Sequence, residues 1–193
     1  MTQTSGPSRF LDLSGIDQLP LWAQVTLAAR LVRRMAMGWR DLTVKQREPM
    51  LHAADRMLSA ASSRACSPED RDAFAMAFDH ATSLKADALA LALFHAGAAT
   101  SAAMRADETS WGDSTTVASV RKALLAACQA AQFGQLQVRI AIAADADLLA
   151  FACSEQGLGR LDAMTPHVFG RLPLVHAFNA AFEEPINIED LYR

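Results

Sequence analysis

Residues 21–37 read LWAQVTLAARLVRRMAM, and the spacing of their apolar side chains predicts an α-helix. Side chains that recur every three or four residues share one helical face. On this face lie Leu21, Val25, Ala28, Val32 and Met35, flanked by Trp22 and Ala29. Pro20 is typical of a helix start. Arg30, Arg33 and Arg34 fall opposite and form a possible surface patch, either a solvated face or a site for an acidic partner or a phosphate.

The same helical period continues along most of the chain. Alanine is abundant and no stretch alternates apolar and polar residues for long, which argues against strands. With 193 residues and 51% hydrophobic side chains, one sizeable core suffices. We therefore predict an all-α, single-domain bundle over residues 1–193, with about five main helices and short C-terminal helices. Residues 1–15 are expected to form an extended arm, and residues 157–193 a loop-rich segment.

Helix boundaries follow from prolines and capping residues. Because proline is accepted in a first turn, the second helix is expected to begin near Pro49 and to end near Ser62. Ser67 to Asp70 reads SPED, which predicts a helix start with a hydroxyl N-cap, proline at the first position and two acids. This third helix is expected to bend near Thr82 and to run beyond residue 104. Its segment 89–94 has apolar residues all round and predicts a central, buried helix.

Two more helices are expected as a hairpin. Asp113 or Ser114 can cap a helix that runs to about Gln132. Gly134 is placed to end it, and a further helix runs from near Gln135 to before Gly157.

Composition excludes several classes of function. The formal net charge of −3, with 18 basic and 21 acidic side chains, does not favour nucleic-acid binding. The first residues lack the pattern of a secretory signal, and residues 88–104 are too short to span a bilayer, so a cytoplasmic protein without a membrane partner is expected. Three cysteines without a C-x-x-C pair indicate reduced thiols.

Residues 139–151 read RIAIAADADLLAF and raise the question of what two aspartates do in an apolar helix. Asp145 and Asp147 lie about 200° apart on the helix, so they are not a catalytic pair. Asp147 falls on the polar side. Asp145 falls within the apolar arc, and a buried carboxylate requires hydrogen-bond donors.

Two interpretations of Asp145 stay open. Backbone amides, a hydroxyl or an arginine could bond it and fix the helix register, as most buried polar groups do. Alternatively, Asp145 could meet His95, which lies in an apolar stripe of the third helix, and the two could line a binding pocket. No catalytic residue is identified. The five histidines lack ligand-pair spacing, so neither a metal nor another cofactor is expected.

The C-terminal region carries one more amphipathic pattern. Its apolar stripe consists of Leu174, Val175, Phe178, Ala181 and Phe182. This stripe is expected either to pack on its own bundle, which leaves a monomer, or to pack against a second protomer in a homodimer.

Two segments resemble a group of known proteins. LPLWAQVTLAARLVRR (residues 19–34) and the alanine-rich ALALALFHAGAATSAAM (residues 88–104) resemble helices of uncharacterised bacterial families grouped with toxin-immunity proteins. The resemblance implies a cofactor-free helical protein that binds and neutralises a partner protein. A non-enzymatic, immunity-like binding protein is therefore the first hypothesis. The alternative is an enzyme or small-molecule binder with a pocket near His95 and Asp145.

Overall fold

The protein is an all-α bundle in the computed structural model, which describes residues 14–39, 41–109, 114–131 and 137–164. For residues 14, 107–109, 114, 127–131 and 137–143 it describes the backbone alone. The elements in these ranges are η1 (Ser14–Gln18), α1 (Leu21–Gly38), α2 (Val44–Ser63), α3 (Pro68–Ser83), α4 (Asp87–Thr109), α5 (Ser114–Ala131) and α6 (Gln137–Glu155). No strand occurs among them. Residues 1–13 of the predicted arm and the C-terminal stripe at Leu174, Val175, Phe178 and Phe182 lie outside the described residues. The last two residues of the predicted arm, Ser14 and Gly15, are not extended but begin η1.

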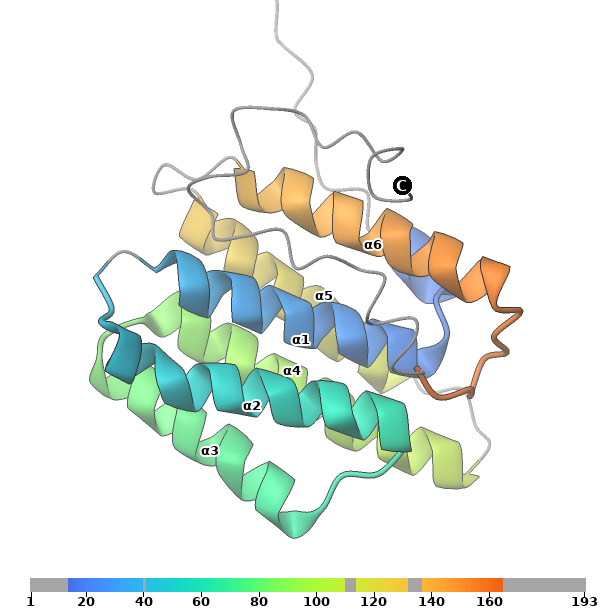
Figure 1. Ribbon diagram of the computed structural model, residues 1–193, viewed down its shortest axis with the longest axis horizontal. Helices are drawn as coiled ribbons and strands as arrows, with labels where there is room; N and C mark the ends of the chain where they lie inside the picture. The colour runs from blue at the N-terminus through green and yellow to red at the C-terminus, as the bar shows by residue number, and fades with distance from the viewer. Residues whose placement is uncertain (1–13, 40, 110–113, 132–136, 165–193) are drawn as a thin grey trace, which may run out of the picture.

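The six α-helices of the described ranges run close to one common direction, with α6 at one edge of the bundle and α3 at the opposite edge (Figure 1). Helix α6 packs against α1, α5 and η1, whereas α3 packs against α2 and α4. Helices α1, α2, α4 and α5 make up the middle of the molecule (Figure 1). The all-α prediction is confirmed.

The centre of the core is α1. All of its residues except Arg33 and Met37 are buried, among them Trp22, Leu27 and Leu31. It packs against α2, α4, α5 and α6. The predicted bounds of this helix agree with the structure, although the side opposite the predicted apolar stripe is buried as well.

Side-chain caps fix the starts of α2 and α3. Ser67 accepts from the Asp70 backbone N–H at 3.1 Å and Asp70 accepts from the Ser67 N–H at 2.7 Å, which is the capping box that SPED favours. Thr43 and Gln46 form the same reciprocal pair at the start of α2. The predicted start of α2 near Pro49 was therefore wrong, because the Thr43 cap begins the helix earlier and Pro49 lies inside it.

The predicted long third helix is two helices in the structure. Helix α3 ends at Ser83, and Lys85 takes a left-handed conformation with φ 57° before α4 begins at Asp87. The Leu84 N–H donates to the His80 carbonyl at 3.1 Å, which satisfies one terminal acceptor of α3. This break is why the described part of the chain has six main helices where the sequence predicts about five.

Helix α3 packs back onto α4 at a glycine. A Cβ atom on Gly97 would lie 3.3 Å from a ring carbon of Phe74, so an alanine there would require the Phe74 side chain to shift by a few tenths of an ångström. Among the described residues, Asp87–Ala106 of α4 is one stretch long and apolar enough to cross a membrane, so the expectation that this segment is too short was wrong; half of it is buried inside the bundle. Core helices of soluble proteins have the same properties.

Candidate functional site

Asp145 lies buried between α1 and α6, where two arginines bind it. Arg34 donates from Nε to Oδ2 at 2.6 Å and from Nη2 to Oδ1 at 2.9 Å, and Arg30 donates from Nη2 to Oδ1 at 2.6 Å. The carboxylate is 2% exposed, and the arginines are 3% and 8% exposed. We call these three residues the buried ion cluster. It confirms the interpretation that an arginine binds Asp145.

The electrostatics of this cluster favour the ionised carboxylate. Burial alone would raise the pKa of Asp145, but the hydrogen bond from Arg34 and the charges of Arg30 and Arg34 outweigh burial and hold that pKa below its ordinary value. Asp145 is therefore a carboxylate at neutral pH. It stabilises the position of α6 on α1 through paired charges and leaves no acid–base group for chemistry.

The predicted surface patch on α1 does not exist as a patch. Arg30 and Arg34 point inward to Asp145, and only Arg33 reaches the surface, where it donates to Asp55 on α2 at 2.7 Å. The prediction of a solvated basic face was wrong because the acidic partner is supplied by the chain itself, more than a hundred residues later.

His95 does not meet Asp145. It lies half-buried on α4, and its ring contacts the neighbouring Phe94 ring with centroids 5.2 Å apart. Burial, aided by the charge of Lys122 on α5, lowers the pKa of His95. Helices α4 and α6 each pack on α1 and α5, which lie between them, so the predicted pocket at His95 and Asp145 is not formed.

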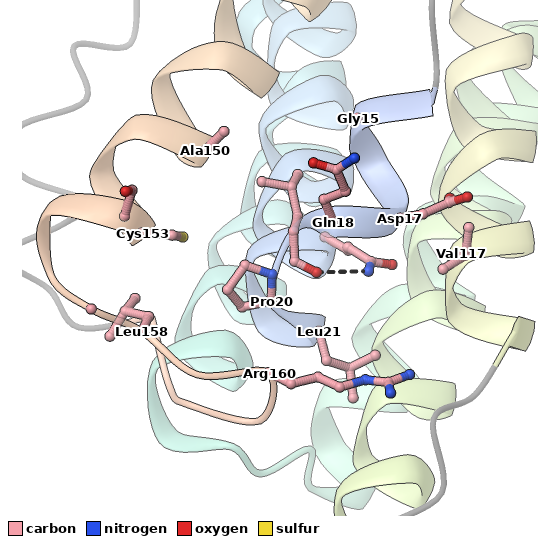
Figure 2. A pocket seen from close by; sticks show the side chains of 14 residues that line it. Gly15, Asp17, Gln18, Pro20, Leu21, Val117, Ala150, Cys153, Leu158 and Arg160 are labelled. Atoms are coloured by element: carbon pink, nitrogen blue, oxygen red, sulfur yellow. Dashed lines mark hydrogen bonds between the residues drawn. The ribbon is translucent and has the colours of Figure 1, made fainter.

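A cleft of about 660 Å³ opens elsewhere, between η1, the start of α1, α5 and the end of α6. Figure 2 shows Cys153 and Leu158, in α6 and the turn after it, facing Pro20 at the start of α1. Gln24 contributes a buried amide: its Nε2 donates to the Leu19 carbonyl at 3.0 Å (dashed in Figure 2), whereas its Oε1 has no partner among the described residues. The Gln24 Oε1 atom can thus accept a hydrogen bond from a small molecule in the cleft.

The groups that line this cleft do not form a catalytic arrangement. Burial raises the pKa of the Cys153 thiol to about 11, so the thiol stays protonated, and its sulfur lies 3.8 Å from that of Met164. Asp17 is engaged by Arg121 at 2.8 Å. Across the described ranges, no three His, Cys, Asp or Glu side chains gather where a metal ion could be held.

An exposed apolar surface lies on the outer side of α4. Leu91 is 44% exposed and Phe94 is 56% exposed. Phe78 of α3 adjoins Phe94, and the two ring centroids are 5.8 Å apart. Leu125 of α5 is 54% exposed and lies one turn beyond Lys122, whose charge acts on His95. We call this group of four apolar side chains the α4 face: Phe78, Leu91, Phe94 and Leu125.

The α4 face overturns the expectation that segment 89–94 is wholly buried. Leu89, Ala90, Ala92 and Leu93 are in the core, but the bundle supplies no described helix to cover the remaining side. The sequence did contain the signal, because apolar residues all round a helix require cover on every side. It did not tell which side the fold would leave open. No sequence pattern indicated the cleft or the role of Gln24.

The chain matches no family model, no curated protein and no solved structure.

Proposed function

We propose that this chain is a non-enzymatic protein-binding protein and that the α4 face is its contact surface. The observation that carries the proposal is the exposure of Leu91, Phe94 and Leu125, each close to half exposed, on two helices that pack against each other. Single exposed apolar residues are normal on a protein surface, but Phe78 packs on Phe94 one turn from Leu91, and exposed apolar side chains grouped around aromatic rings are typical of protein contacts.

The charge distribution of the molecule supports the same function. The buried ion cluster, whose three side chains are at most 8% exposed, is inaccessible to a ligand. The four side chains of the α4 face are uncharged, and the lowered pKa of the adjacent His95 keeps its imidazole neutral near pH 7. Removing this surface from water is therefore opposed by little desolvation of charge.

The resemblance to toxin-immunity proteins suggests one version of this function, in which the partner is a toxin that the chain neutralises. Residues 88–104 carry half of that resemblance and include Leu91 and Phe94. This version predicts a partner of different sequence, encoded in a neighbouring gene.

Site-specific photocrosslinking in the native cells tests the proposal. A photoreactive phenylalanine analogue replaces Phe94 in the full chain, and the matched control carries it at Met76, which is 70% exposed on the side of α3 away from Phe78. We expect a discrete protein adduct at position 94 that is absent at position 76 and is lost when Leu91→Arg is added. Equal adducts at both positions, or none at position 94, would refute the α4 face as a contact surface.

A further inference from the structure

We propose that a second copy of this chain occupies the α4 face, with the two α4 helices antiparallel across a two-fold axis near Ala96. This inference rests on the proposed function and names its partner. It is carried by the order of residues along the outer side of α4. When two copies of this helix are placed antiparallel, each residue faces one of complementary size or charge.

The outer side of α4 is a single stripe. Its members are Asp87, Leu91, Phe94, Ala98, Ser101 and Arg105, all exposed or partly exposed. Their spacing alternates four and three residues, which is the spacing of a seam between two packed helices. From its first to its last residue the stripe is about 27 Å long at 1.5 Å per residue.

Bulky and small residues occupy opposite halves of this stripe. Phe94 and Ala98 lie two residues on either side of Ala96, and Leu91 and Ser101 lie five residues on either side. In an antiparallel pair centred there, each Phe94 faces the partner's Ala98 and each Leu91 faces the partner's Ser101. Large side chains then meet small ones, as close helix packing requires. A parallel pair would set Phe94 against Phe94 and leave the small half empty.

Charge follows the same symmetry. Asp87 and Arg105 are exposed and lie nine residues on either side of Ala96. The antiparallel arrangement places each acid opposite the partner's base, so two complementary pairs form at the ends of the seam. At the centre, the neutral imidazole of His95 adds no repulsion where the two copies are closest.

The neighbouring helices extend the contact. Phe78 of α3 flanks the stripe at Phe94, Leu125 is exposed on α5, and both helices pack directly on α4. Since only three large side chains of this surface are close to half exposed, the apolar contact is small, and we expect a reversible dimer with a Kd of about micromolar order.

Sedimentation velocity of the full chain between about 1 and 200 µM tests this pairing. We expect a monomer–dimer equilibrium. Asp87→Arg and Arg105→Asp should each weaken dimerisation by about tenfold, because every reversal creates two like-charge contacts. The double variant should restore most of the wild-type affinity. Met76→Arg is the matched control and should leave the dimer unchanged.

Thermal melts of all variants in the monomeric range confirm that each one is folded. If either charge variant fails to fold, Phe94→Ala, Ala98→Phe and their combination provide the same test. Each single variant should weaken the dimer, and the double variant should restore it because it again places phenylalanine opposite alanine. A wild-type monomer at every concentration, or a double variant no better than the singles, would overturn the pairing. A monomer that still crosslinks a different protein through position 94 would overturn the second copy as partner and leave the proposed function standing.

Discussion

The burial of helices α1 and α4 differs from what their sequences suggest. Helix α1 carries three arginines and is almost completely buried, whereas α4 has the more uniformly apolar sequence and leaves Leu91 and Phe94 in solvent. Arg30 and Arg34 are tolerated in the core because the Asp145 carboxylate accepts hydrogen bonds from both of them. Leucine and phenylalanine remain outside because no described helix covers them. At these positions of α1 and α4, burial therefore depends on the available partner as well as on hydrophobicity.

Removing the partner of the α1 arginines should have the largest effect. Asp145→Leu leaves Arg30 and Arg34 buried without their carboxylate, and we expect a loss of about 3–5 kcal/mol in the free energy of unfolding. Asp145→Asn keeps an acceptor oxygen and should cost less. Urea denaturation of both variants measures the difference. Equal stability of wild type and the leucine variant would contradict the role given to the buried ion cluster.

Low pH should remove the stability that the ionised Asp145 contributes, without any substitution. The pKa of Asp145 is lower in the folded protein than in the unfolded chain, so the folded state binds fewer protons and the cluster contributes fully above about pH 4. That contribution should disappear as the pH falls through the lower, folded pKa. The difference in unfolding free energy between wild type and Asp145→Asn, measured from pH 7 down to pH 2, should be constant at first and then shrink.

The asparagine variant also serves as the internal control of this titration. Asp70, whose pKa is lowered as well, is present in both proteins and cancels in the difference. A difference that stays constant down to pH 2 would show that the charge of Asp145 contributes nothing to the stability of the bundle.

Substitutions on the α4 face should hardly affect the stability of the monomer. Phe94→Gln changes a side chain that is already 56% exposed, so we expect the free energy of unfolding of the dilute protein to change by less than about 1 kcal/mol. Denaturant melts at low micromolar concentration measure it. A loss as large as that of Asp145→Leu would mean that Phe94 belongs to the core of its own bundle.

The sequence predicts local structure well and long-range pairing poorly. The bounds of α1 and the SPED start of α3 follow from proline, capping and periodicity, which act over a few residues. That Asp145 needs a donor was predictable from its place in an apolar arc. Which donor it meets was not, because Arg30 and Arg34 are more than a hundred residues away and their encounter depends on how α6 packs on α1. The exposure of Leu91 and Phe94 depends in the same way on which helices surround α4.

Hydroxyl-radical footprinting of the full chain across a dilution series tests most directly whether the α4 face is closed by a second copy. We predict that Leu91, Phe94 and Leu125 are protected at high concentration and become as reactive as their exposure implies on dilution, while Met76 and Val44 react equally throughout. Constant labelling of Phe94 at all concentrations, parallel to that of Met76, would contradict this prediction.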